Sequence, residues 1–303
     1  MIRRTFSLLA FAALATGTGC NGGGTSPPPF PTGRALLPQH LYVGGSHGVA
    51  QFNIPLTSAS TANFTAMSGY EYSIAVDADA NLVVSTGASL AFFRAPLSGA
   101  STPNTVLTTG RPEYQLAFAD SHDLWIADGL GGVRTLKFPF SSADLPPAAI
   151  GNAAIVGASG IAFDGAQNLY VVNDQNNQGF RGARNSNLLV YAPPYTGSPI
   201  ATPNVPTSYA GVAVSATQLF VACLNRFDVY DLPITSTSSP AFSIFIGNSA
   251  PLLAVDAGGN LYAGNFTAQT IAVYPLPLSA ASKPTVTLQL DHTFGLNTFA
   301  IGR

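Results

Sequence analysis

Short apolar runs recur along the chain at a nearly constant spacing. The most regular of them is an apolar triplet that occurs six times, as Leu41-Tyr42-Val43, Leu82-Val83-Val84, Leu124-Trp125-Ile126, Leu169-Tyr170-Val171, Leu219-Phe220-Val221 and Leu261-Tyr262-Ala263. The first residues of successive triplets are 41, 42, 45, 50 and 42 positions apart. Between the triplets, short alternating segments predict strands, and the 23 prolines and 30 glycines disfavour helices.

Each triplet has partner strands before and after it. Most triplets follow a second apolar run, at Ile74–Asp77, Leu116–Phe118, Ile161–Asp164, Val212–Val214 and Leu253–Asp256. An alternating strand comes after each triplet and ends near a proline, at Pro55, Pro96, Pro139, Pro193, Pro233 and Pro277. A Ser/Thr-rich turn and another apolar run follow. Four short strands in every ~40–45 residues are typical of a β-propeller blade, so the sequence predicts an all-β propeller.

The ends of the repeat array predict the number of blades. No copy of the preceding run stands before Leu41, whereas an extra copy, Phe299-Ala300-Ile301-Gly302, lies near the C-terminal end. If this strand completes the first blade, whose other strands run from Leu41 to about Met67, the ring closes without open edges. A seventh blade would require a seventh triplet. We therefore predict a six-bladed β-propeller of four-stranded blades over residues 36–303, closed by the C-terminal strand.

The N-terminal segment has the layout of a secretion signal. Arg3 and Arg4 precede the apolar stretch Phe6–Ala15, which is too short to span a membrane stably. The following residues, Gly17-Thr18-Gly19-Cys20, resemble the lipobox of bacterial lipoproteins, although Gly17 replaces the usual aliphatic residue. The resemblance implies a signal peptide over 1–19, a lipid on Cys20, and a location in the bacterial cell envelope, periplasmic or at the outer surface. Plain secretion is the alternative.

Composition limits the partners of the domain. Residues 20–35, rich in Gly, Pro and Ser, are expected to form a lipidated, disordered tether, so that contact with a membrane is through the lipid only. Without Arg3 and Arg4 the chain has 10 basic and 14 acidic residues, which gives no basic surface for nucleic acid. The second cysteine, Cys223, lies in an apolar run that predicts a buried strand, so no disulfide with Cys20 is expected.

The clearest repeat, Leu253–Asn265 continuing to Ile271–Tyr274, resembles an NHL repeat. Its turn Asp256-Ala257-Gly258-Gly259-Asn260 has weaker copies at Asp77–Asn81 and Asp164–Asn168. We expect Gly and Asn in this turn to adopt dihedral angles that other residues avoid. The resemblance covers about residues 36–303 and implies a propeller fold. It implies no single function, because NHL-type propellers include enzymes, nucleic-acid readers and binding scaffolds.

A related family, the gluconolactonase-like propellers, holds a divalent metal at one mouth of the channel. Its ligands include a Glu and Asn-Gly or Asp-Gly pairs just before the inner strands, which suit a hard cation such as calcium. At the matching positions Ser159 and Ala210 keep the following glycine but lack the ligand side chain. Only Asn297, together with Glu71 and Glu113, could contribute ligands. We therefore expect no cofactor, with calcium as the alternative.

Two acidic residues beside tyrosines recur at the same repeat position. Glu71-Tyr72 and Glu113-Tyr114 precede the inner strands of adjacent blades, and Tyr209 has the corresponding place in the fifth blade. With Asn297 they are candidate ligand-binding residues at the channel mouth, for a cation, a sugar or acid/base chemistry. The alternative is a solvated rim of ordinary loop residues.

A polar insertion lengthens the fourth blade at Asn173–Asn185. Its Phe180, Arg181 and Arg184 are candidate partner-contact residues, because propellers place such contacts on loops. The alternative interpretation is that the segment is an inert loop.

Other motifs are better explained by structure. Gly44-Gly45-Ser46-His47-Gly48 matches a nucleophile pattern, but it joins two predicted strands instead of a strand and a helix. Asp128, Asn173 and Asn265 recur two positions after the triplet, where side chains commonly bond the backbone of a turn. The four histidines have no zinc-ligand spacing.

These observations favour a non-catalytic, secreted or envelope-anchored propeller that binds a protein, glycan or small ligand. The alternative is a divergent metal-dependent lactonase-like hydrolase or lyase that uses Glu71, Glu113 and Asn297 at the channel mouth.

Overall fold

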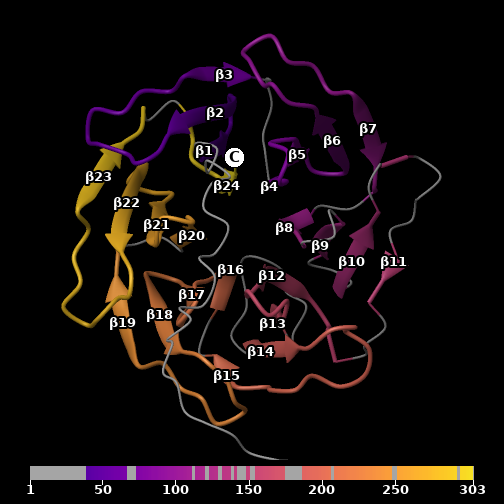
Figure 1. Ribbon diagram of the computed structural model, residues 1–303, viewed down its shortest axis with the longest axis vertical. Coiled ribbons are helices and arrows are strands. Elements are labelled where there is room, and N and C mark those ends of the chain that lie inside the picture. Colours follow the sequence, from indigo (N-terminus) through magenta and orange to yellow (C-terminus); the bar gives the residue numbers. More distant parts are fainter. Residues whose placement is uncertain are drawn as a thin grey trace, which may run out of the picture. The chain divides into compact units, whose positions relative to one another are not determined.

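The computed structural model describes residues 39–66, 73–110, 113–119, 123–128, 132–137, 140–141, 148–150, 154–174, 186–205, 208–247, 251–291 and 294–302. Residues Leu37–Arg303 form one compact unit. Its described residues form six four-stranded antiparallel sheets, and Figure 1 shows them as blades around a common centre. Among the same residues, no helix has the length and hydropathy needed to cross a bilayer.

The four strands of every blade follow one another from the centre of the ring to its outer edge. Blade 1 consists of β24 (Thr298–Gly302), β1 (His40–Gly45), β2 (Gly48–Asn53) and β3 (Phe64–Ala66). Blade 2 consists of β4 (Ser73–Val76), β5 (Leu82–Ser85), β6 (Ser89–Phe93) and β7 (Thr105–Thr108). Blade 3 consists of β8 (Glu113–Phe118), β9 (Leu124–Asp128), β10 (Gly132–Leu136) and β11 (Ala148–Ala149). Blade 4 consists of β12 (Ala158–Phe163), β13 (Leu169–Asp174), β14 (Ser186–Tyr191) and β15 (Asn204–Val205). Blade 5 consists of β16 (Ser208–Val214), β17 (Gln218–Cys223), β18 (Arg226–Asp231) and β19 (Phe242–Phe245). Blade 6 consists of β20 (Pro251–Val255), β21 (Asn260–Asn265), β22 (Thr270–Pro275) and β23 (Val286–Gln289).

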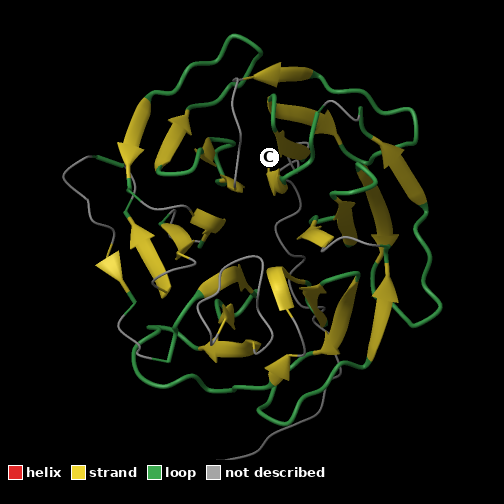
Figure 2. Cartoon of the chain, turned by 180° about the vertical axis from the view of Figure 1, so that it is seen from behind, coloured by secondary structure: helices red, strands yellow, loops and turns green. Residues whose placement is uncertain are grey.

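The ring closes as the sequence predicts. The C-terminal strand β24 pairs with β1 in antiparallel register, with His40 opposite Gly302 and Val43 opposite Phe299. Each inner strand also contacts the inner strands of both neighbouring blades, in the order β24, β4, β8, β12, β16, β20 and back to β24. Figure 2, drawn from the other side, shows the same closed arrangement. The predicted six-bladed fold with four-stranded blades is therefore confirmed.

The apolar triplets occupy the second strand of every blade and are buried on both sides. Leu261 and Ala263 of β21 pack against blade 5, whereas Tyr262 between them packs against blade 1. A strand with apolar neighbours on both faces has no side exposed to solvent. Its sequence is therefore a continuous apolar run and does not alternate between apolar and polar residues. The triplet is thus the sequence signature of a strand held between two other blades.

The Asp-to-Asn turns connect the first and second strands of blades 2, 4 and 6. Asp256 accepts the backbone N–H of Asn260 at 2.7 Å through Oδ1 and the Asn260 amide at 2.9 Å through Oδ2. The hydroxyl of Tyr262 also donates to Asp256 Oδ2 at 3.1 Å. Burial, together with this carboxylate, raises the pKa of Tyr262. Asp77 and Asp164 form the same bonds to Asn81 and Asn168.

The dihedral expectation for these turns is only half right. The residue with positive φ is the one before the asparagine: Gly259 at 79°, Ala80 at 64° and Gln167 at 62°. Asn260 itself has ordinary dihedral angles, and its side chain instead bonds to Asp256. The asparagine is therefore a hydrogen-bonding partner, and only the preceding residue needs the left-handed conformation.

A second recurring turn joins the third and fourth strands. Cis peptide bonds precede Pro55, Pro96, Pro194, Pro233 and Pro277, so in blade 4 the cis bond lies at Pro194 and not Pro193. In blade 1 the turn then closes on itself, because Thr57 N–H donates to Ser60 Oγ at 2.8 Å and Ser60 N–H donates to Thr57 O at 3.2 Å. The same reciprocal pair is formed at Ser98/Ser101, Thr235/Ser238 and Ser279/Ser282. The Ser/Thr-rich segments are therefore ordered turns.

We expect Ala80→Gly to be more stable than Ala78→Gly by about 1 kcal/mol, since Ala80 has a left-handed φ that costs a Cβ-bearing residue ~1–2 kcal/mol. Both substitutions gain similar freedom in the unfolded chain, and Ala78 is an exposed residue of the same turn with ordinary φ. Denaturant unfolding of the two variants measures the difference. Equal stabilities would contradict the assignment of strain to position 80.

Candidate functional site

The two faces of the ring carry different kinds of connection. All inner strands begin at one face, which we call the entry face. Because successive strands in a blade are antiparallel, the turns between second and third strands lie there too. The Asp turns and the proline turns lie on the opposite face. Gln39, the first described residue, is at the opposite face, where its Oε1 accepts the N–H of Ala257 at 2.9 Å.

Those predicted mouth residues whose backbone the structure describes lie around the entry face. Glu113 and Tyr114 are the first two residues of β8, Tyr209 is the second residue of β16, and Asn297 immediately precedes β24. Glu71 and Tyr72 lie outside the described residues, as do the side chains of Glu113, Tyr114 and Tyr209. The described backbone at this repeat position, in blades 1, 3 and 5, therefore lies at the entry face.

Three neighbouring inner strands are irregular at that mouth, a feature that the repeat pattern did not reveal. The strand register shifts between Glu113 and Gln115 in β8, between Ala158 and Gly160 in β12, and between Ser208 and Val212 in β16. Such bulges change the direction in which neighbouring side chains point. They fall on the positions at which gluconolactonase-like propellers place ligands.

Gln115 connects the three bulged strands. Its Oε1 accepts the N–H of Ile161 in β12 at 3.1 Å, and its Nε2 lies 3.5 Å from the carbonyl oxygen of Val212 in β16. The backbones of β12 and β16 also approach closely, since a Cβ on Gly160 would lie 2.9 Å from the N atom of Gly211 and 2.9 Å from Gln115 Oε1. The glycines at this mouth therefore serve the packing of inner strands against one another.

At two of the expected metal positions, 159 and 210, the chain has no carboxylate or amide side chain to offer a cation. Ser159 is buried and its hydroxyl donates to the Val172 carbonyl of its own blade at 3.3 Å. Position 210 is an alanine, which offers no side-chain ligand. Among the residues that the structure describes, no group of three His, Cys, Asp or Glu side chains could hold a metal ion. Asn297 donates its backbone N–H to Gly44 O at 2.9 Å, and its buried Nδ2 bonds to no described residue.

The nucleophile-like motif is a hairpin turn between β1 and β2, as the sequence predicts. Ser46 and His47 form the turn, and Gly45 pairs with Gly48. The hydroxyl of Ser46 lies 3.0 Å from His47 Nδ1 and donates to Phe294 O at 3.1 Å. Because the Ser46 hydroxyl donates its proton to Phe294 O, it does not donate it to His47, so the two residues are not arranged as a nucleophile and its base.

The residues two positions after the triplet fasten the loops between blades. Asn173 Oδ1 accepts the N–H groups of Val156 and Gly157 at 2.8 and 3.1 Å. Asn265 Nδ2 donates to Ile246 O at 2.7 Å. Asp128 differs, since its partner is the side chain of Arg134 in an ion pair of 2.9 Å. The structural role predicted for the two asparagines is confirmed.

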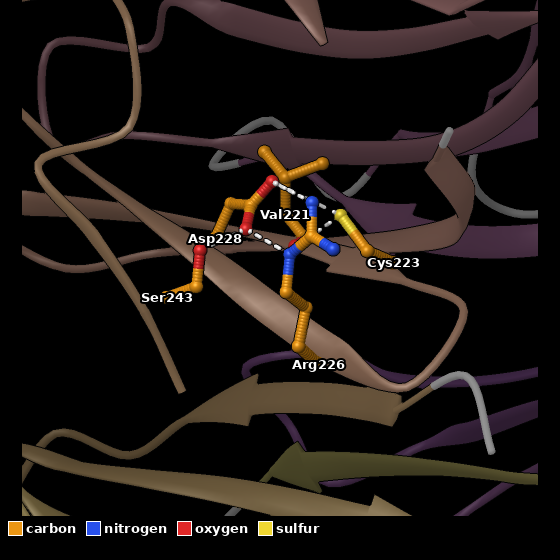
Figure 3. A network of polar contacts seen from close by, with 5 residues as sticks. All are labelled: Val221, Cys223, Arg226, Asp228 and Ser243. Atoms are coloured by element: carbon orange, nitrogen blue, oxygen red, sulfur yellow. Dashed lines mark hydrogen bonds and ion pairs between the residues drawn. The ribbon is translucent and has the colours of Figure 1, made fainter. Parts of the chain in front are cut away.

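A buried polar network ties the last three strands of blade 5 together, and Figure 3 shows its members. Asp228, which is 1% exposed, accepts hydrogen bonds from Arg226 Nε at 2.7 Å, Ser243 Oγ at 2.6 Å and the Cys223 thiol at 3.2 Å. Burial, with the nearby Asp228 carboxylate, raises the pKa of the Cys223 thiol to about 12. The hydrogen bond to Asp228 raises the pKa of Arg226. Cys223 is therefore a protonated thiol and a hydrogen-bond donor, not a nucleophile.

Apolar side chains gather at the entry face. Of the six large apolar side chains that are exposed among the described residues, four lie on loops or strand ends of this face: Val156, Leu224, Phe245 and Phe266. Phe245 is the most exposed of them at 69%. Sequence reasoning missed this surface, because Phe245 alternates like any other strand residue and only the fold shows that one of its sides is uncovered.

Some predicted sites cannot be placed. Phe180, Arg181 and Arg184 of the polar insertion lie outside the described residues, as does Cys20.

Comparisons with known proteins support the fold. No protein-family model matches the chain, and no curated protein matches it. Among solved structures, a chain of the nidogen/laminin complex has a TM-score of 0.63 and 16% identity, and the match covers 87% of this chain and 98% of that one. A protein of unknown function from Bacteroides caccae has a TM-score of 0.60 and 11% identity over 87% and 98% of the two chains. The WD40 β-propeller domain of Doa1 has a TM-score of 0.53 and 9% identity over 86% and 82%. At these identities the similarity shows the propeller fold alone.

We expect Gly160→Ala to lower the free energy of unfolding by about 1–3 kcal/mol, because the added methyl group would collide with the Gly211 backbone. Gly165→Ala is the matched control, since a Cβ there meets nothing within 4 Å. Denaturant unfolding measures both variants. If the two substitutions had the same small effect, the close contact between β12 and β16 would be wrong.

Proposed function

We propose that this chain is a non-catalytic, NHL-repeat-like binding scaffold of the bacterial cell envelope, anchored by a lipid on Cys20. Its entry face binds the partner. The observation that carries this proposal is that four of the six large apolar side chains exposed among the described residues lie on the entry face. Large apolar side chains exposed on one face of a protein mark interaction sites.

The described reactive groups at the entry face favour binding over catalysis. Asp128 is paired with Arg134, and Asp228 with Arg226. The high pKa of the Cys223 thiol and the bond from Ser46 to Phe294 O leave neither group prepared for nucleophilic attack. Enzymes of the hydrolase class need such a group, or a metal-bound water, close to an acid or base.

The comparison and the position of Gln39 agree with this proposal. One similar fold belongs to the nidogen/laminin complex, which is an assembly of two proteins. In this chain the covalent connection to Cys20 leaves from Gln39 at the opposite face. The first described residue of the domain therefore lies on the face away from the surface proposed to bind the partner.

A titration with divalent ions separates the scaffold from the alternative metal-dependent hydrolase or lyase. We expect no saturable change in melting temperature when millimolar calcium, and then other divalent ions, is added to the metal-stripped chain, because a ligand stabilises only a protein that has a site for it. A saturable rise of several degrees that disappears in the Glu71→Gln, Glu113→Gln double variant would favour the hydrolase.

Fractionation tests the anchor. We expect Cys20→Ser to move the protein from the membrane fraction to the soluble fraction and to abolish incorporation of labelled fatty acid, because that cysteine is the proposed acceptor of the lipid. Cys223→Ser is the matched control and should leave the distribution unchanged. Membrane association that survives Cys20→Ser would contradict a lipid anchor at this residue.

A further inference from the structure

Among the residues that the structure describes, no strand pairs with the outer edge of blade 5. Ile246 donates its N–H to Asn225 O at 3.1 Å, in the same register as the pairs of β18 and β19. Since inward and outward backbone groups alternate along an antiparallel strand, Ile244 and Phe242 also bond to β18. The N–H and C=O groups of Ser243 and Phe245 therefore face away from the blade, where they can pair with another strand.

This edge differs from the corresponding edges of the other blades. In β23 of blade 6, the residue equivalent to Phe245 is Gln289, whose amide folds back onto the carbonyl oxygens of Ala268 and Gln269 at 3.1 Å. In β7 of blade 2 it is Thr108. The outer strands β11 and β15 have two residues each. Of the described four-residue outer strands, β19 alone ends in an exposed aromatic side chain.

Two more exposed apolar residues lie beside the end of β19. Leu224 is next to Asn225, which accepts the N–H of Ile246, and Phe266 is next to Asn265, which donates to the Ile246 carbonyl. Leu224 is 53% and Phe266 49% exposed. Both residues are therefore on loops fastened to the residue that follows Phe245.

The charge of this region selects the kind of partner. Strand β19 contains no ionisable residue, and Arg226, which is opposite Phe245, is neutralised by its ion pair with Asp228 at 2.7 Å. Natural edge strands usually carry a charge, a proline or a bulge that prevents pairing, and β19 has none of these. A charged segment would lose hydration at this surface without gaining an opposite charge.

We propose that the edge of β19 binds an extended, uncharged segment of a partner protein as a fifth strand of blade 5. Backbone hydrogen bonds to Ser243 and Phe245 supply the pairing, and a β-branched or aromatic residue of the partner packs on Phe245. This inference rests on the proposed scaffold function and specifies the chemistry of its partner.

The probe for this proposal is a phage-displayed library of random linear peptides, selected on the soluble Cys20→Ser chain from position 20 to Arg303. Ser243→Pro removes the outward N–H and the hydroxyl that donates to Asp228, but no backbone bond to β18. Ser243→Ala removes the same hydroxyl while keeping the amide. Thr287→Pro is the matched control, because Thr287 occupies the equivalent outward position on β23. Phe245→Glu replaces the apolar side chain proposed to contact the partner by a charged one. Melting curves confirm that each variant is folded.

We expect the selected peptides to be uncharged and rich in β-branched and aromatic residues. Relative to Ser243→Ala, their affinity should fall about tenfold or more in Ser243→Pro, because an outward hydrogen bond is lost and the proline ring crowds the edge. Phe245→Glu should weaken binding similarly, and Thr287→Pro should bind as the parent chain does.

Four results would overturn the proposal. The first is that no binding peptide is selected, and the second is that the selected peptides bind equally well to Ser243→Pro and Phe245→Glu. The third is that the chain forms concentration-dependent dimers that Ser243→Pro dissociates. The fourth is that the chain binds neutral phosphatidylcholine vesicles and only Phe245→Glu abolishes this binding. The dimer would identify a second copy as the occupant, and the vesicles would identify lipid. Peptides that bind elsewhere on the entry face would leave the scaffold function standing while removing β19 from it.

Discussion

The second strand of every blade is covered on both faces, and this constraint governs the whole molecule. A four-stranded sheet whose central strand reads Leu-Tyr-Val or Leu-Phe-Val cannot expose either side to water without a large loss of apolar burial. Each blade therefore needs two neighbours, and a linear array would leave two blades with one uncovered face. The pairing of β24 with β1 closes the ring, so that no blade is left with an uncovered face. Closure gives every blade a neighbour on each side.

Polar groups in so apolar a ring are used mainly to hold its connections. The carboxylates of Asp77, Asp164 and Asp256 each accept backbone and side-chain donors within one turn, and Asn173 and Asn265 fasten the loops that pass between blades. A buried carboxylate or amide is tolerated when its hydrogen bonds are made, and otherwise costs more than it contributes. The few charged residues that the structure describes in the interior thus have structural partners.

The two faces consequently have different roles. On the opposite face, the turns that the structure describes are compact, and most of them recur in several blades with side chains that bond to their own backbone. The entry face carries the irregular features: the bulges of β8, β12 and β16, the link made by Gln115, and the exposed side chains of Leu224, Phe245 and Phe266. Differences between blades are where a repeat protein can recognise one particular partner.

The sequence by itself determined the number of blades, the identity of their strands and the closure by residues 299–302, because these follow from a repeat period and from apolar runs that are visible in one dimension. It also predicted that the candidate mouth residues share one face, since equivalent repeat positions lie at equivalent ends of strands. Only the tertiary structure decided the link that Gln115 makes between β8, β12 and β16, the close approach of strands at Gly160, the network around Asp228, and the exposure of Phe245. The physical reason is that these features depend on contacts between blades and on strand register. Neither of these produces a repeating pattern of apolar and polar residues in the sequence.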